Sequence, residues 1–359
     1  MSCLLILESF GTDRARWLDA WSAMGRDPFC HPDYVELVSS GIGKAQCAAY
    51  SSDGIDVLMP FIRRRVQSPT DSPFEELSDA ISPYGYGGPY SSEPEVPAAF
   101  FGAMADYMHD VKLISFFGRV SLDIVLGAGP PEPRHRMVHM ADNVIVSLRR
   151  SMEDQWRHYD RKVRKNVNKA LRAGLHVEVN DSFTNLDDFV SLYQSTMERR
   201  SASSWYRFDR DFFARIEQSL ANSMCVAEVH DSEGELVSAE LVLRSDDHLY
   251  SYLGGTLSSA FPWGPNDLLK HAVITYGHAA ELEGYVLGGG QAPGDGIFRY
   301  KKAFDPEGVR PFYGLQLVSD QTTYRRLTDA RCLELSRREP ALHTDSLFFP
   351  EYRAPGLET

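Results

Sequence analysis

The sequence predicts an α/β protein of the α+β type, in which mixed, mostly antiparallel sheets are flanked by helices. Three observations predict this class. Short apolar segments typical of strands come in pairs joined by polar turns with glycine, at 45–50 with 56–63 and at 225–229 with 236–243. Between them lie segments with helical spacing, such as 186–200. Finally, the chain has 359 residues, of which 43% are hydrophobic, enough for two packed domains.

The first part of the chain is expected to form one α/β unit. Its apolar start meets Glu8 at once and has no basic segment, so a first strand is favoured over a signal peptide. Pro97 suits the first turn of a helix. The segment 67–94 is rich in Ser, Pro and Gly and predicts a long loop, a kind of loop that is often functional. After the first strand we expect helices near 17–21 and 34–38, strands at 45–50 and 56–63, the loop 67–94, a helix at 96–111, a short strand region at 116–122 and a surface loop at 127–133.

A second unit begins at the alternating strand 143–148. Gly174 ends a long helical stretch, because glycine commonly follows the last helical residue. The polar turn at 231–234 joins two strands into a hairpin. We expect a helix at 151–173, a strand at 175–179, a helix at 186–200, the hairpin strands 225–229 and 236–243, a strand at 248–254, a helix at 267–283, strands at 284–287 and 312–318, and a helix at 323–338.

Composition limits the classes of partner. The net charge is −13, whereas proteins that bind long nucleic acids are usually basic, so any such contact must be local. Five cysteines lie far apart without a CxxC pair, which favours reduced thiols in a cytoplasmic protein. No run approaches the ~18 apolar residues of a membrane span. Histidine spacing gives no metal signature, and neither a Walker loop nor a GxSxG motif occurs.

The helical stretch 151–173 carries a stripe of positive charge. Cations at i, i+4, i+8 and i+11 share one face, and within 157–172 Asp160 is the only acidic residue that opposes them. Such a stripe favours an anionic partner, of which phosphate backbones are the common case. A solvated face paired with acidic neighbours is the alternative. The cations are Arg161, Lys165, Lys169 and Arg172, with Lys162 and Arg164 beside them.

Glycines and lysines follow one another near residue 290. Gly288, Gly289 and Gly290 come directly after a predicted strand and could form an anion-binding nest, or simply a flexible loop. The segment 298–304, FRYKKAF, then places two lysines between aromatic residues. An ammonium group there could stabilise a developing oxyanion. By spacing alone, a structural strand with exposed lysines is the favoured interpretation.

A tyrosine–glycine segment, SPYGYGGP at 82–89, offers Tyr84 and Tyr86 to a ligand. Its alternative role is a rigid turn with packed aromatic rings.

Taken in order, these motifs resemble the Fem-type aminoacyltransferases and the wider group of tandem GNAT-like proteins over roughly residues 30–320. The motifs are SPYGYGGP at 82–89, RKxRKNxxKAxRxG at 161–174, TMER at 196–199, PNDLL at 265–269, GGG at 288–290 and YKKAF at 300–304. The resemblance implies two tandem GNAT-like modules, one of 1–142 completed by about 310–345 and one of 143–309, followed by a tail at 346–359. No heptad run predicts the long coiled-coil arm of some members, so an armless form is expected.

The resemblance also implies an activity. An aminoacyl-tRNA would donate its amino acid to an amine of a peptidoglycan precursor, a small peptide or a nucleoside, without a resident cofactor. Lys301 matches the family lysine, Tyr300 stands where Phe is common, and Arg199 matches an acceptor-binding arginine. Asp295 is a candidate base by its place near the glycines. Tyr84, Tyr86, Asn266 and the three glycines are assigned to the acceptor, and Arg161, Arg164, Lys165 and Lys169 to tRNA phosphates.

Two rival functions remain. One is an acyl-CoA-dependent N-acyltransferase, a class of enzyme that usually holds the CoA pyrophosphate with an Arg/Gln-x-x-Gly-x-Gly/Ala loop that opens a helix. The other is a non-catalytic binding protein, because a fold does not fix a function.

Overall fold

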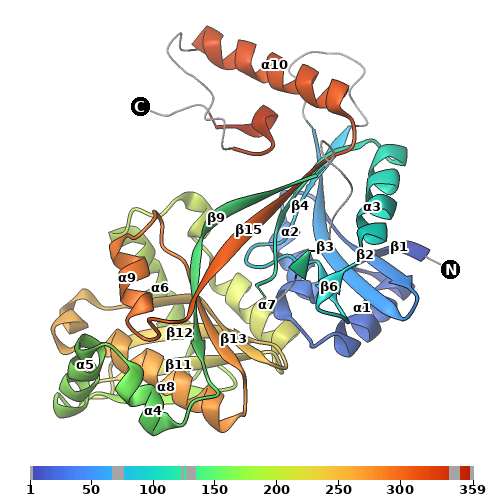
Figure 1. Ribbon diagram of the computed structural model, residues 1–359. Helices are drawn as coiled ribbons and strands as arrows, with labels where there is room; N and C mark the ends of the chain where they lie inside the picture. Colours follow the sequence, from blue (N-terminus) through green and yellow to red (C-terminus); the bar gives the residue numbers. More distant parts are fainter. Residues whose placement is uncertain (1–2, 67–76, 123–124, 127–134, 339–347, 356–359) are drawn as a thin grey trace. The chain divides into compact units, whose positions relative to one another are not determined.

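The computed structural model describes residues 3–66, 77–122, 125–126, 135–338 and 348–355 (Figure 1). The chain divides into two compact units. Unit 1 lies within Met1–Met24, Phe29–Met140 and Phe312–Thr359, and unit 2 within Gly25–Pro28 and Ala141–Pro311.

Unit 1 is built on a mixed sheet whose strand order is β1-β2-β3-β4-β7-β15. Neighbouring strands are antiparallel except β4 and β7, which are parallel. A short β5 adds to β3, and β6 pairs with β8. The strands are β1 (Cys3–Glu8), β2 (Lys44–Ser52), β3 (Ile55–Arg65), β4 (Ser78–Ile81), β5 (Tyr90–Ser91), β6 (Glu95–Val96), β7 (Leu113–Arg119), β8 (Val125–Leu126) and β15 (Val309–Val318). The helices are α1 (Gly11–Ala23), η1 (Pro28–Cys30), α2 (Pro32–Ser39), α3 (Ala98–Asp110), α10 (Gln321–Arg338) and η4 (Glu351–Arg353).

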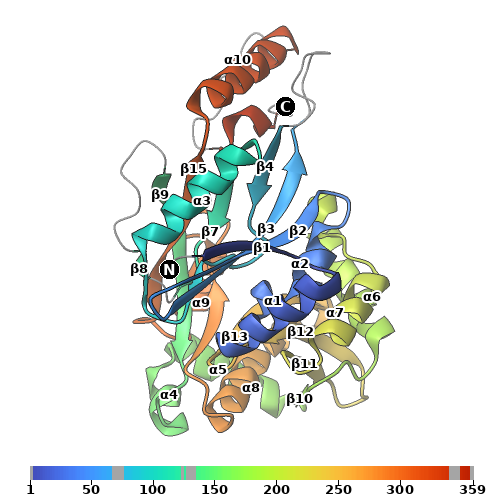
Figure 2. The same cartoon turned by 90° about the vertical axis from the view of Figure 1, so that its right-hand side faces the viewer.

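The core of unit 1 forms between this sheet and α3, which crosses it in Figure 2. Helix α3 buries Phe100, Met104 and Met108, which recur every fourth residue and therefore share one face. Strand β3 buries Met59 and Phe61 at strand alternation against them. The sequence pattern therefore selects both the helix and the face it buries.

The strands of unit 2 pair in the order β9-β14-β13-β12-β11-β10. All its pairs are antiparallel except the parallel pair β13–β14. The strands are β9 (His135–Ser147), β10 (His176–Asn180), β11 (Met224–His230), β12 (Leu236–Arg244), β13 (His248–Thr256) and β14 (Gly284–Gly288). The helices are α4 (Met152–His158), α5 (Arg161–Arg172), α6 (Leu186–Arg199), η2 (Ser204–Tyr206), α7 (Arg210–Leu220), η3 (Ser258–Trp263), α8 (Pro265–Ala279) and α9 (Gly296–Lys302).

Helices α5 and α8 pack side by side on the core of unit 2 (Figure 1). Helix α5 buries Val163, Val167 and Ala170 at i, i+4 and i+7, while its charged residues point elsewhere. Helix α8 buries Leu269 and Val273 in the same core. One apolar stripe therefore fixes which face of α5 remains outside.

Three predicted elements differ from the structure, and one helix of the structure was not predicted. The helix expected at 151–173 is two helices, because Tyr159 and Asp160 are extended and the Asp160 carboxylate caps the new start at the Lys162 amide, 3.3 Å away. Segment 298–304 is largely helix α9 rather than a strand. Helix α7 was not predicted, and the loop 67–94 contains β4 and β5. The loop at 127–133 lies outside the described residues.

The predicted class of mixed, mostly antiparallel sheets flanked by helices is confirmed. In the described ranges, the longest helix is α10 with 18 residues, so no long coiled-coil arm occurs there. Within the same ranges, no helix combines the length and apolar character of a membrane span.

Candidate active site

Unit 2 contains a pocket of about 500 Å³. Its walls come from the C-terminal end of α6, strands β12 and β13, helix η3, the first turns of α8 and helix α9. Strand β13 pairs with β14 only over His248–Tyr250, and the following six residues, 251–256, line the pocket. Because the two parallel strands part there, the backbone of β13 is available to a ligand.

The lining of the pocket is predominantly cationic. Four basic residues and one carboxylate contribute to it: Arg199, Arg200, Lys270, Lys301 and Glu240. Glu240 is itself engaged by Lys270, so the carboxylate does not balance the other three cations. A pocket with this charge favours an anionic group or a reaction that develops negative charge.

Lys270 forms the floor of the pocket. Its ammonium group donates to the carboxylate of Glu240, to Ser251 Oγ at 2.8 Å and to Tyr285 OH at 3.0 Å, which uses all three hydrogens. Tyr285 in turn donates to the second oxygen of Glu240 at 2.6 Å. Burial lowers the pKa of Lys270, while Glu240 opposes that shift. Lys270 is therefore a buried, saturated support and has no hydrogen left for a ligand.

The buried ion pair of Lys270 and Glu240 was not predicted from the sequence, although the sequence contains an indication of it. Lys270 shares the apolar face of α8 with Val273, three positions on, and Glu240 stands between Ala239 and Leu241 in an apolar strand. A charge on each of two buried faces indicates a pair, because an unpaired buried charge is very costly.

Lys301 differs from Lys270 in having free hydrogens. Its Nζ donates to the carbonyl oxygen of Gly289 at 2.7 Å, and among the described residues that is its one hydrogen-bond partner. Burial, with repulsion from Lys270, lowers its pKa to about 8. The group is thus mostly protonated at neutral pH and keeps two donors for a ligand.

Tyr300 lies beside Lys301 in the wall of the pocket. Its hydroxyl is buried and has no hydrogen-bond partner in the described part of the chain. Burial raises its pKa well above the ordinary value, and the charges of Asp267 and Glu240 add to the shift. A buried hydroxyl without a partner is costly, which makes it a candidate contact for a ligand.

Asp295, the candidate base, has another role in the structure. Its carboxylate accepts the amide hydrogens of Phe298 and Gln291 at 2.7 Å and of Ala292 at 3.2 Å, and so caps the start of α9. These amides hold its pKa below the ordinary value. A carboxylate held in this way is a weak base, so the geometry does not support a role as general base.

The three glycines join β14 to this cap. Gly288 ends β14, and Gly289 provides the carbonyl that holds Lys301. At Gly290 an added Cβ would lie 2.3 Å from the Asp295 carboxylate, so only glycine allows this close approach. The glycines therefore position Lys301; they do not line the pocket itself.

Arg199 and Asn266 both reach the pocket. The Arg199 guanidinium lies 5.0 Å from the centre of the Phe261 ring. The Asn266 side-chain oxygen accepts from Thr256 Oγ1 at 2.8 Å, which leaves its amide hydrogens for a ligand. The structure thus gathers Lys301, Tyr300, Arg199 and Asn266 around one space.

The predicted tRNA-binding residues divide into two groups. Arg161, Lys165 and Lys169 are exposed on α5, and none forms an ion pair within the described residues. Arg164 instead donates to carbonyl oxygens at the end of α4, among them that of Arg157 at 2.8 Å. Arg164 therefore caps the end of α4 through one guanidinium nitrogen, a role that depends on the unpredicted break at Tyr159 and Asp160, and its contact with tRNA stays a prediction.

Tyr84 and Tyr86 belong to unit 1, not to the unit with the pocket. The carbonyl of Tyr84 accepts from Tyr34 OH at 2.7 Å, and the Tyr86 ring meets Phe29 and Phe312 edge-on. These contacts fit the packed turn that the sequence left open as an alternative.

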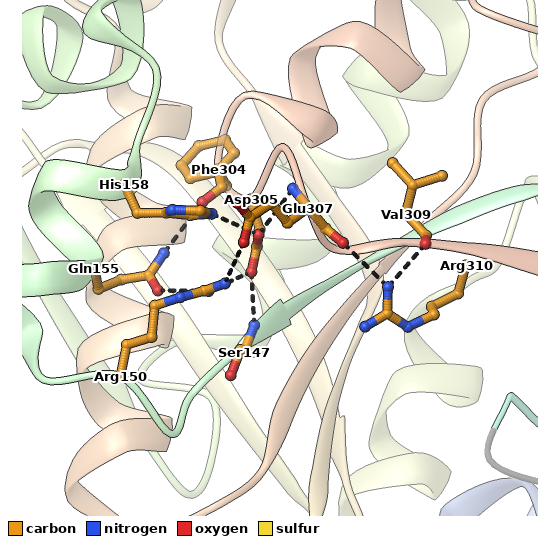
Figure 3. A network of polar contacts seen from close by, with 9 residues as sticks. All are labelled: Ser147, Arg150, Gln155, His158, Phe304, Asp305, Glu307, Val309 and Arg310. Atoms are coloured by element: carbon orange, nitrogen blue, oxygen red, sulfur yellow. Dashed lines mark hydrogen bonds and ion pairs between the residues drawn. The ribbon is translucent and has the colours of Figure 1, made fainter.

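Asp305 anchors the segment that carries Lys301 (Figure 3). The residue is 0% exposed, and its carboxylate accepts from Arg150 at 2.6 Å, from His158 at 2.8 Å and from the Ser147 amide at 3.0 Å. Burial raises its pKa, but these bonds together hold it below the ordinary value. They tie the residues after α9 to α4 and β9.

We expect Asp305→Asn to lower the free energy of unfolding of unit 2 by about 3 kcal/mol, because it breaks a buried ion-paired network. Because the pKa of Asp305 is lower in the folded protein than in the unfolded chain, its ionised carboxylate stabilises the fold at pH values above the unfolded pKa of about 4. This stabilisation is lost as the pH falls through the folded-state pKa. Denaturant titrations near neutral pH and near pH 3 should therefore show that the free energy of unfolding falls less on acidification in the variant than in the wild type. Glu307→Gln, at a side chain that is 77% exposed, is the control; equal effects of both changes would contradict the anchoring role.

Comparison with known proteins agrees with this geometry. Residues 157–302 match the model of the acetyltransferase (GNAT) domain. The chain is 22% identical over 172 residues to the UDP-N-acetylmuramoylpentapeptide-lysine N(6)-alanyltransferase of Weissella viridescens, an alignment that covers 47% of this chain and 50% of that protein. The chain thus spans about half the length of this curated relative.

Two solved structures share the fold. The crystal structure of FemX has a TM-score of 0.61 and 13% identity, with 82% of this chain and 92% of that chain covered. In sequence and fold, the chain is thus similar to Fem-type proteins. L-PGS from Bacillus licheniformis, at 15% identity, has a TM-score of 0.56 over 88% of this Fem-like chain and 94% of its own.

The predicted resemblance to Fem-type proteins and the predicted fold class are confirmed by these matches. The region matched to the GNAT domain contains every lining residue of the pocket in this Fem-like protein, from Thr196 to Lys301, as well as the exposed cations of α5.

Proposed function

We propose that the protein is an acyltransferase that moves an amino acid from aminoacyl-tRNA to an amine and thereby forms an amide bond. The observation that carries the proposal is Lys301: a charged ammonium group with two free hydrogens, at a cationic pocket of the unit whose helix α5 exposes unpaired cations. An ammonium group with free hydrogens can stabilise an oxyanion, and the exposed cations of α5 can bind RNA phosphates.

In the proposed reaction the acceptor amine attacks the ester carbonyl carbon of the aminoacyl-tRNA. The carbonyl oxygen becomes an oxyanion and is stabilised by Lys301. The bond from carbon to the ribose oxygen then breaks, the amide forms, and the proton lost by the amine ends on the ribose oxygen. Since the ester is already activated, no covalent enzyme intermediate is needed. Positioning of the two substrates supplies much of the rate.

The acceptor is proposed to be an amine of a peptidoglycan precursor, by analogy with the named substrate of the curated relative. A small peptide or a nucleoside bearing an amine is the alternative. Arg199 can bind an anionic group of the acceptor, and Asn266 can donate to it. Tyr84 and Tyr86 remain proposed acceptor contacts. The glycines Gly288, Gly289 and Gly290 do not line the pocket, and we propose that they serve the acceptor only through the position of Lys301.

An acyl-CoA donor is the second candidate, and the match to an acetyltransferase domain favours it. The segment 291–296, QAPGDG, also fits the Gln-x-x-Gly-x-Gly pattern of the pyrophosphate-binding loop in such enzymes, and it leads directly into helix α9. The observation that favours tRNA over CoA is the row of exposed cations on α5, which suits a longer phosphate backbone. In both cases the donor is a co-substrate and no resident cofactor is proposed.

Tyr300→Phe is expected to leave the unliganded protein as stable or more stable, by up to about 1 kcal/mol, because it removes a buried hydroxyl without a partner. If the hydroxyl binds substrate, the same change should raise KM. Thermal unfolding and steady-state kinetics measure the two effects. A clear loss of stability would mean that the hydroxyl has a partner in the free protein.

The donor can be identified by incubating the protein with a pool of charged tRNAs and, separately, with acyl-CoAs, each with candidate amines. We expect amine-dependent deacylation of one class of charged tRNA. Consumption of acyl-CoA alone would reject the tRNA donor and leave the acyltransferase assignment standing.

A further inference from the structure

Two large aromatic side chains are exposed on η3, at the edge of the pocket. Phe261 is 50% exposed and Trp263 is 41% exposed. Pro262 stands between them and restricts the backbone, so the two rings are presented by a stiff segment. Single exposed apolar residues are ordinary, but a stiff aromatic pair beside a binding pocket indicates a contact surface.

Helix η3 connects the pocket to the basic helix α5. On one side Phe261 lines the pocket, and Arg199 lies over its ring. On the other side Gly264, which follows η3 with φ +75°, approaches α5 so closely that an added Cβ would lie 3.1 Å from the Asn166 side chain. The aromatic pair therefore bridges the cationic pocket and α5.

Positively charged residues of α5 lie close to the point where Gly264 approaches Asn166. Lys162 and Lys169 are exposed and lie one turn before and after Asn166 on the helix surface. Neither forms an ion pair within the described residues. Exposed aromatic rings interleaved with unpaired cations are the combination that binds single-stranded nucleic acid, in which bases stack on rings and phosphates meet the cations.

We propose that η3 is a stacking platform for the unpaired nucleotides at the 3′ end of the donor RNA. Trp263 and Phe261 would stack bases, Lys162 and Lys169 would hold the neighbouring phosphates, and the terminal ester would reach Lys301. The inference rests on the proposed function, which it extends by naming the part of the RNA that is recognised and the residues that recognise it. A protein partner is less well matched, because the aromatic residues adjoin unpaired cations rather than a wider apolar face.

The test compares two RNA probes that share one duplex stem, one with an unpaired 3′ end and one blunt. Fluorescence anisotropy gives the affinity of each for the intact protein. The wild type should prefer the unpaired end, and Trp263→Ala should lose about tenfold to a hundredfold in affinity for that probe alone. Trp263→Phe should restore most of the preference, because it keeps a ring. Trp205→Ala is the matched control, since Trp205 is 43% exposed, much like Trp263, but lies on η2 and not on η3.

Each outcome has one meaning. If the wild type binds neither RNA, the tRNA-dependent function fails. If it binds both RNAs equally, or if Trp263→Ala matches the wild type and the Trp205 control, the stacking platform fails while the function stands. Free CoA is added as a competitor: displacement of the unpaired-end probe by CoA at comparable concentration would assign the platform to the nucleotide of CoA and overturn the RNA assignment.

Discussion

Replacing Lys301 by alanine is expected to slow aminoacyl transfer by about 10²–10³-fold, the usual effect of removing one oxyanion donor. The ammonium group is the one lysine at the pocket with hydrogens left for a ligand, since Lys270 uses all three of its own among the described residues. Donor binding should change little, because the cations of α5 remain. Single-turnover rates with saturating donor measure the effect, and undiminished transfer would remove Lys301 from the mechanism.

Lys301→Arg tests whether the reaction depends on the positive charge at position 301. The pKa of Lys301 is lowered to about 8, so the charged form is lost as pH rises above that value. In the wild type, the rate should therefore decline above about pH 8, after allowance for ionisation of the amine. Arginine stays charged and should lack this decline, even if its own rate is lower. The same high-pH decline in both proteins would assign it to another group.

Removing the three exposed cations Arg161, Lys165 and Lys169 together should weaken donor RNA binding by roughly a hundredfold at physiological salt. The slope of log affinity against log salt should become shallower by about one for each phosphate that the variant no longer neutralises. Because the apolar face of α5 is untouched, the fold should be retained. Binding titrations at several salt concentrations measure both quantities.

Arg215→Ala provides the control for this triple change. Arg215 is exposed on α7 of the same unit, away from α5 in the sequence. Its loss removes a similar surface charge and should leave both the affinity and the salt slope almost unchanged. If Arg215 has the same effect per charge as the α5 cations, binding is a property of the net charge and α5 is a solvated face.

Much of the fold could be predicted because local patterns and burial agree. The i, i+4 spacing of Val163 and Val167 predicts both helix α5 and the exposure of its cations. The break before α5 was missed, since Tyr159 and Asp160 interrupt the helix without proline or glycine. Segment 298–304 is too short for periodicity to separate helix from strand, and the decisive signal was the cap at Asp295.

The site was predictable only in part, because its contacts join distant segments. Lys301 was assigned through the family motif, whereas spacing alone favoured an exposed strand. Glu240 and Lys270 meet across a strand and a helix, and Asp305 meets Arg150 across 155 positions. Such pairings follow from tertiary packing, so a single sequence can indicate that a buried charge needs a partner but not which partner it has.

The central claim is that this pocket transfers an amino acid from tRNA to an amine through Lys301. The most direct measurement is a single-turnover assay with tRNA carrying a labelled amino acid and with a peptidoglycan precursor or another amine as acceptor. The account predicts that the label appears in an amide of the acceptor with the wild type and almost disappears with Lys301→Ala. Label that stays on the tRNA with every acceptor, while acyl-CoA acylates the same amines, would contradict it.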